Sequence, residues 1–279
     1  MEKPVELVSL ADTFEKKFYR FSIDDNIWAF RDIARQRPAS LFDNDYLGTL
    51  YRLHRKHGTR FQLNVYLETD GFDLTQMPDC YREEWAANAE WLRLSFHARA
   101  DQPSRPYAES GYDQVKAECE AVHQQIRRFA GEQTLSYYTT IHFAAATREG
   151  CRALQDCGIK GLIALCSDGR GGVRLSYYLD EAASRFLDHN GVARDVDNGL
   201  TFIRNDMVIN TVPEGEIRPR LEQLKASDKR DGFVEVMIHE QYFYPDYPYY
   251  LPDFAVRMET AILWLKENGY QSVYLEDIL

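Results

Sequence analysis

Titratable side chains recur directly after short apolar segments of the sequence, which is where βα proteins place catalytic groups. Carboxylates and imidazoles are the side chains that bind divalent metal ions and transfer protons near neutral pH. The residues in these positions are Asp24, Asp25, His97, Asp101 and His239. The sequence therefore predicts one site that combines a metal ion with acid–base residues.

Asp24 and Asp25 directly follow the expected strand 18–23. Successive side chains of a strand point to opposite sides, so one carboxylate can bind a metal while the other takes a proton. An Asp-Asp pair is also common in turns and helix caps, and taken alone this pair is more typical of such a turn or cap.

His97 and Asp101 are four residues apart after the expected strand 92–96. If a helical turn follows that strand, their Cβ atoms lie about 5–6 Å apart on one face and both can reach one ion. A surface histidine beside an acid is the alternative. His239 alone is more typical of a structural histidine. The functional interpretation gains support because the strands of a barrel converge on one mouth.

Short apolar segments alternate with amphipathic ones, which is typical of a βα architecture. We predict an α/β fold, a single distorted (β/α)7–8 barrel over residues 1–279, with a less regular segment or insertion at about 167–231. Expected strands are 18–23, 61–67, 92–96, 135–142, 161–166, 201–203, 234–238 and 272–275. Expected helices are 45–56, 81–90, 112–129, 148–156, 180–188 and 254–268. Gly169-Arg-Gly-Gly172 lacks the Gly-Lys-Ser/Thr ending of a phosphate loop and is interpreted as a hairpin turn.

The net charge of −11 disfavours binding to nucleic acid or to an anionic membrane surface. The first residues lack the apolar region of a secretory signal, and no stretch approaches 18 apolar residues, so we expect a cytoplasmic protein. The five cysteines show no metal-binding or disulfide spacing and are expected to be reduced.

Several motifs resemble those of the polysaccharide deacetylases (carbohydrate esterase family four). Phe21-Ser-Ile-Asp-Asp25 resembles the first motif, T-F-D-D-G, and His97-Ala-Arg-Ala-Asp101 resembles the second, H-x-x-x-H or H-x-x-x-D. Val236-Met-Ile-His239 resembles the late L-L-H motif, and 258–278 is similar to the last helix and strand of the family. The motifs occur in the family's order across 18–278.

The resemblance implies a role for each residue. Asp25, His97 and Asp101 would hold a divalent metal, Asp24 would be the general base and His239 the general acid. Zinc is the favoured ion, and manganese, iron, cobalt and nickel are alternatives. The chemistry would be attack of metal-activated water on an amide or ester.

The sequence also departs from the family pattern. Asn26 stands in place of the usual Gly of the first motif, Ala98 replaces Ser or Thr in the second, and the expected Arg–Pro motif is replaced by a segment from Tyr138 to His142. His142 is expected to bind substrate or to join the metal ligands. The further expected substrate-binding residues are Tyr138, Glu240 and Tyr242.

The aromatic stretch 241–250 predicts a wall that stacks on sugar faces, although a packed loop or a self-association patch is as consistent with it. We expect a metal-dependent hydrolase of an acylated sugar or related small molecule. The alternatives are a C–N hydrolase of a small cyclic or linear amide and a barrel that binds carbohydrate or another ligand without turnover. A small-molecule or carbohydrate substrate is the expected partner, and self-association is a further expectation.

Overall fold

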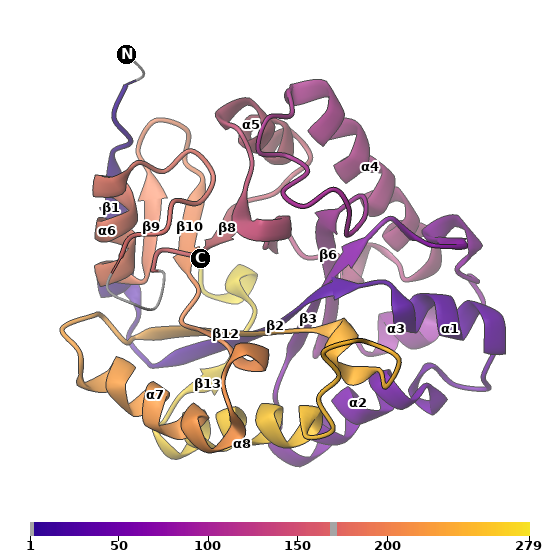
Figure 1. Ribbon diagram of the computed structural model, residues 1–279. Coiled ribbons are helices and arrows are strands. Elements are labelled where there is room, and N and C mark those ends of the chain that lie inside the picture. Colours follow the sequence, from indigo (N-terminus) through magenta and orange to yellow (C-terminus); the bar gives the residue numbers. More distant parts are fainter. Residues whose placement is uncertain (1–2, 168–171) are drawn as a thin grey trace.

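One parallel sheet contains most of the strands after which the sequence places its candidate site residues. The computed structural model describes residues 3–167 and 172–279. The sheet has the order β11–β12–β2–β3–β6, and each neighbouring pair is parallel (Figure 1). β13 (Gln271–Ser272) pairs with the start of β2. The strands of the sheet are β2 (Phe18–Asn26), β3 (Phe61–Tyr66), β6 (Leu92–Ala98), β11 (Met207–Val208) and β12 (Phe233–His239).

A second sheet has the order β1–β9–β10–β8–β7. β7, β8 and β10 are parallel, whereas β9 and β1 are antiparallel additions at the edge. Its strands are β1 (Leu7–Ser9), β7 (Tyr138–Thr139), β8 (Gly161–Ala164), β9 (Val192–Asp195) and β10 (Thr201–Arg204). β4 (Glu68–Thr69) and β5 (Phe72–Asp73) form a separate small hairpin.

The two sheets meet on both sides and enclose a distorted barrel. On one side Leu94 and Leu135 form a parallel bridge, and the Ser136 N–H donates to the Leu94 carbonyl at 2.8 Å. On the other side the chain runs from β10 into β11, where the Asp206 N–H donates to the Glu235 carbonyl at 2.9 Å. The predicted α/β barrel is therefore confirmed, with β2, β3, β6, β7, β8, β10–β11 and β12 following one another around it.

Helices surround the strands (Figure 1). The six predicted helices are present, two of them (112–129 and 148–156) with the predicted ends and four with ends shifted by one to three residues. Two further helices, α1 and α7, were not predicted. The helices are α1 (Trp28–Gln36), α2 (Asp45–His57), α3 (Arg82–Ala87), α4 (Tyr112–Phe129), α5 (Arg148–Asp156), α6 (Glu181–Asn190), α7 (Glu214–Ala226) and α8 (Phe254–Glu267). Across the described residues every helix is too short or too polar to cross a membrane.

Four expected strands are shorter than predicted, namely 61–67, 135–142, 161–166 and 272–275. The segment 135–142 contains only the two-residue β7, and His142 begins a 3-10 turn, His142–Ala144. The segment 167–231, expected to be irregular, contains α6, β9, β10, β11 and α7. The predicted hairpin turn at 169–172 lies largely outside the described residues.

The barrel interior is polar because alternate residues of β2 face it. Tyr19, Phe21 and Ile23 belong to the apolar core under the helices. The intervening Arg20 and Ser22 both bond to the Glu235 carboxylate of β12. Polar side chains therefore already line the barrel below the point where its strands end.

α4 contains a buried histidine that makes the fold sensitive to acid. Burial and the nearby Arg127 lower the pKa of His123 to about 4. The unfolded chain takes up a proton on this residue near pH 6.5, whereas the folded protein does so only near its lowered pKa. Stability should therefore fall as pH drops through this window, by about 2 kcal/mol at pH 5.

Urea unfolding at pH 7 and pH 5 measures this loss. The His123→Leu protein should lose about 2 kcal/mol less than the wild type between the two pH values. His189→Gln, which changes an exposed histidine, should behave as the wild type. An equal loss in the His123→Leu protein would contradict the assignment.

Candidate functional site

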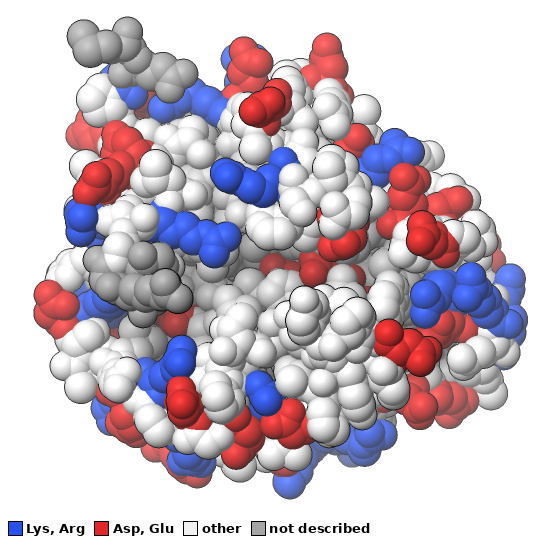
Figure 2. All heavy atoms as spheres, in the orientation of Figure 1, with Lys and Arg blue, Asp and Glu red and all other residues white. Residues whose placement is uncertain are grey.

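A cavity of about 320 Å³ opens where the parallel strands end. β2 contributes Asp24 and Asp25, β6 contributes His97, and β12 contributes His239. Acidic side chains are visible in the central hollow of the face shown in Figure 2. The predicted convergence of these four residues on one barrel mouth is thus seen in the structure.

The two neighbouring aspartates both face the cavity, contrary to the expectation that they point to opposite sides. Asp25 has a φ of 65°, and the pairing of β2 with β3 shifts register between Ile23 and Asn26. This left-handed conformation turns the Asp25 side chain back toward the cavity, and Asp tolerates it better than most residues do. Asn26 supports the shift by donating to the carbonyls of Ile23 and Asn64.

Three buried ligand atoms converge beneath the cavity. Asp25, His97 and His142 each offer one atom, and these atoms lie within 4.8 Å of one another. Asp25 Oδ1 is 2.9 Å from His97 Nε2 and 3.3 Å from His142 Nδ1. The two histidine nitrogens are 3.2 Å apart. A carboxylate and two imidazoles in this arrangement match the donors that zinc and related ions prefer, with room for further ligands.

His97 is oriented for a metal by its second nitrogen. Nδ1 donates to the Thr140 carbonyl, which can only accept, and this leaves Nε2, which faces Asp25 Oδ1 at 2.9 Å, as the nitrogen that a metal ion would use in place of a proton. Burial would lower the pKa of His97, but Asp24, Asp25 and the Thr140 carbonyl outweigh it and raise that pKa. The site therefore favours positive charge next to Asp25.

Asp25 remains ionised although it is buried. Burial would raise the pKa of Asp25, but His239, His142 and His97 hold it well below its usual range. Tyr66 donates its hydroxyl to Asp25 Oδ1 at 2.5 Å. Burial and the Asp25 charge raise the pKa of Tyr66 well above normal, so the hydroxyl keeps its proton.

Asp101 does not belong to the buried group. Its side chain is 60% exposed, and Oδ1 lies 3.7 Å from His142 Nε2. No helical turn follows β6, because the chain runs through bends after Ala98. The structure therefore places Asp101 at the rim of the cavity. His142 occupies the place among the three buried donors that was predicted for Asp101.

Asp24 and His239 lie on adjacent strands and form a register pair. Asn64 Nδ2 donates to Asp24 Oδ1 at 2.6 Å. His239 Nδ1 is 2.9 Å from the amide oxygen of Asn210, so Nδ1 carries a proton and Nε2 is left for other partners. These supporting amides fix the orientation of the predicted base and acid.

Three further residues, Tyr242, Glu240 and Tyr138, were predicted to bind substrate, and the structure places each of them differently. Tyr242 lines the cavity, with its ring 5.1 Å from that of Tyr247, as the predicted aromatic wall requires. Glu240 is fully buried and accepts the backbone N–H groups of Ile27, Trp28 and Ala29 at 2.7–2.9 Å. It caps α1 and has no free oxygen for a substrate.

Tyr138 lies away from the cavity, in the second apolar cluster with Ile163 and Val273. A Cβ atom at Gly161 would lie 2.6 Å from its ring, so this position needs glycine. The structure therefore places Tyr138 outside the cavity at which it was predicted to bind substrate.

Tyr66, Thr140, Asn64 and Asn210 were not predicted. Tyr66 lies at the end of the second expected strand, 61–67, at a strand exit like that of His97, and this signal was present in the sequence. Asn210 follows β11, whose two residues were not recognised as a strand.

No family model matches the sequence, and no curated protein does so significantly. Solved structures match its fold. A mutant of a CE4 family pseudoenzyme with restored activity gives a TM-score of 0.55 at 11% identity, covering 95% of this chain and 68% of that one. A peptidoglycan N-acetylglucosamine deacetylase gives 0.54 at 10% identity, covering 95% and 89%. The chain has the fold of the CE4 deacetylases and esterases.

A further CE4 fold match is a family 4 acetyl xylan esterase from Clostridium thermocellum in complex with a cobalt ion, with a TM-score of 0.52 at 12% identity, covering 94% of this chain and 90% of that one. The structures that share this fold thus include an esterase in complex with a metal ion, a deacetylase and a mutant of a pseudoenzyme. The fold alone does not decide activity, which depends on the residues of the site.

Proposed function

We propose that the chain is a metal-dependent hydrolase, deacetylase-like, that cleaves an amide or ester of an acylated sugar or related small molecule. The observation that carries the proposal is the buried group of Asp25, His97 and His142 directly beside Asp24 and His239. Structures of similar fold are described as an N-acetylglucosamine deacetylase and an acetyl xylan esterase.

The donor set fits a divalent ion, with zinc favoured and cobalt, manganese, iron or nickel as alternatives. Asp25, His97 and His142 would hold it. When bound, such an ion would polarise the acyl carbonyl and lower the pKa of a water molecule. Tyr66 donates its hydroxyl to Asp25 Oδ1, the same oxygen that faces both histidines, and so holds that carboxylate in place.

Asp24 and His239 supply the proton transfers. Asp24 takes the proton of the attacking water, and Asn64 holds one of its oxygens in place while the other is used. His239 delivers a proton from Nε2 to the leaving amine or alkoxide, because Asn210 occupies Nδ1. Tyr242 and Tyr247 exclude water on one side of the substrate.

The size of the cavity supports a small acyl group, since about 320 Å³ holds only part of an oligosaccharide. A screen of acetylated and formylated sugars, with added divalent metals, tests the proposal. Small cyclic and linear amides are included, because the same residues would serve a C–N hydrolase.

The Asp24→Asn protein is the control for this screen. It should lose about 10²–10⁴-fold in kcat, because the base is removed while the shape is kept. Its metal content, measured by plasma mass spectrometry, should equal that of the wild type. A wild-type protein that holds metal but turns over none of these substrates would favour the binding barrel without catalysis.

A further inference from the structure

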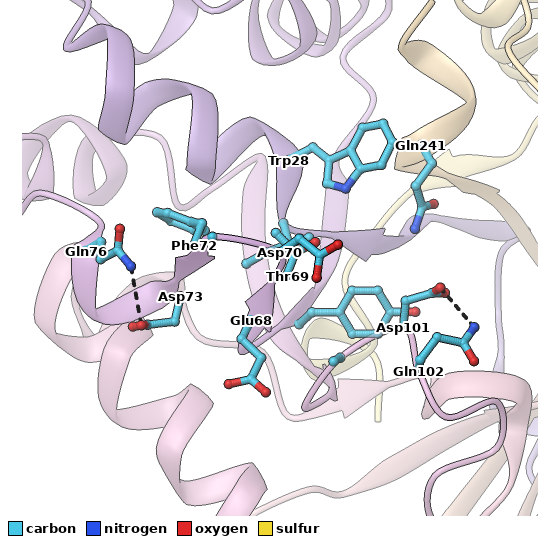
Figure 3. Close-up of a pocket in the computed structure, with 14 residues that line it drawn as sticks. Trp28, Glu68, Thr69, Asp70, Phe72, Asp73, Gln76, Asp101, Gln102 and Gln241 are labelled. Carbon is cyan, nitrogen blue, oxygen red and sulfur yellow. Dashed lines mark hydrogen bonds between the residues drawn. The ribbon is translucent and has the colours of Figure 1, made fainter. Parts of the chain in front are cut away.

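A second hollow adjoins the candidate active site. This groove has a volume of about 590 Å³ and runs between α1, the β4–β5 hairpin and the loop after β6 (Figure 3). Asp101 borders both the groove and the cavity. Tyr66 lines the groove and donates to Asp25 in the cavity. The two hollows therefore meet at Asp101, with Tyr66 between the groove and Asp25.

The groove carries negative charge without a cation of its own. Among the described residues that line it are four carboxylates, and none is Lys, Arg or His. Glu68 pairs with Arg99, and Asp73 accepts from Thr75 and Gln76. Asp70 has no ion pair in the described part of the chain, and Asp101 lies 3.7 Å from His142 Nε2 and accepts from Gln102 Nε2 at 3.2 Å. Asp70 and Asp101 thus leave charge for a ligand to compensate.

An independent observation is the side chain of Gln241. It is 6% exposed, and its Oε1 atom has no hydrogen-bond partner among the described residues. In Figure 3 its amide and the indole nitrogen of Trp28 lie on one side of the groove, facing the side of Asp70 and Asp101. A buried acceptor without a donor carries a free-energy cost that a ligand can remove.

These groups select one ligand chemistry. Gln241 Oε1 and the oxygens of Asp70 and Asp101 are acceptors, so the ligand must donate several hydrogen bonds and carry positive charge. A protonated amine does both, whereas a hydroxyl compensates no charge and an anion is repelled. Trp28 lies on the same side, where its ring already contacts the Arg31 guanidinium at 5.2 Å, so it adds an apolar wall and not a further site for the cation.

We propose that the groove binds a protonated amine on the non-reacting part of the substrate. Resting on the proposed function, this assigns the substrate class: an acylated amine that carries a second, free amine. N-acylated diamines and partly deacylated amino-sugar oligomers share this chemistry.

Matched substrate pairs test the assignment and distinguish its two sources. One pair is N-acetyl-1,5-diaminopentane and N-pentylacetamide, and the other is glucosaminyl-N-acetylglucosamine and its diacetylated form. The member with the free amine should show about tenfold higher kcat/KM, through KM, and the preference should shrink with added salt. Equal kcat/KM values within both pairs would overturn the proposal.

Variants separate the groove from the rest of the surface. Asp70→Asn should reduce the preference about fivefold. Asp79→Asn removes an exposed carboxylate that does not line the groove, and it should leave the preference unchanged. An equal reduction in both proteins would indicate general attraction to the acidic surface and overturn the site.

A binding measurement keeps this inference separate from the proposed hydrolase function. Calorimetric titration of 1,5-diaminopentane and of the glucosamine dimer should show binding that Gln241→Leu weakens about three- to tenfold. The same variant should unfold at an equal or higher temperature, because the unpartnered oxygen is removed. Binding without turnover of any substrate would support the groove and contradict the hydrolase. Turnover without amine binding would support the hydrolase and contradict the amine site in the groove.

Discussion

The His142→Ala protein is expected to bind Zn²⁺ at least about 100-fold more weakly than the wild type, whereas Asp101→Asn should bind it within about threefold. His142 Nδ1 lies 3.2 Å from His97 Nε2 and 3.3 Å from Asp25 Oδ1, so its removal opens the group of three donors. The Asp101 side chain is 60% exposed and stands outside that group. Competition against a chromophoric chelator measures both affinities.

Cobalt absorption provides a second readout, because the intensity of the visible bands depends on the number and type of ligands. The Asp101→Asn spectrum should match the wild type, and the His142→Ala spectrum should not. Circular dichroism checks that each variant is folded. The opposite result, with metal lost in Asp101→Asn and kept in His142→Ala, would restore the ligand set expected from the sequence and refute the one proposed from the structure.

The second large effect concerns stability. Glu235→Ala is expected to lower the free energy of unfolding by about 3–5 kcal/mol, because it leaves the Arg20 guanidinium buried without its counterion. Arg20 is 1% exposed and Glu235 is 0% exposed, and the two side chains form an ion pair inside the barrel. Urea unfolding followed by tryptophan fluorescence measures the loss.

Two further proteins test the reason for that loss. The double variant Arg20→Met/Glu235→Leu removes both charges and should recover most of the stability of the wild type. Glu267→Ala breaks an ion pair with Arg218 on the surface and should leave the unfolding midpoint unchanged. A double variant as unstable as Glu235→Ala would show that the charge itself is not the cause.

The sequence predicted the barrel well because its strands differ sharply from its helices in periodicity. It did not predict α1, whose N-terminal N–H groups are capped by Glu240, more than 200 positions along the chain. α7 was missed because it contains Pro219 and buries only Ile217 and Leu221. Contacts at long sequence separation and weak apolar patterns leave little local signal.

The predicted site shows the same division. The positions of Asp24, Asp25, His97 and His239 follow from strand ends, and the structure brings these residues to one cavity. Spacing could not show whether a helical turn follows β6, and that question decides the location of Asp101. The left-handed backbone at Asp25 is likewise set by pairing between β2 and β3 and not by the two aspartates alone.

The cap formed by Glu240 has a consequence for the choice of substrate. Glu240 follows His239 directly in the chain and holds the N–H of Trp28, so the acid of the cavity and the aromatic side of the groove are tied to one buried carboxylate. The distance between His239 and the Trp28 side of the groove is therefore held by buried hydrogen bonds to one carboxylate. A substrate with its leaving group at His239 and its free amine in the groove has to match that distance, so the separation of its two nitrogens should decide how well it is cleaved.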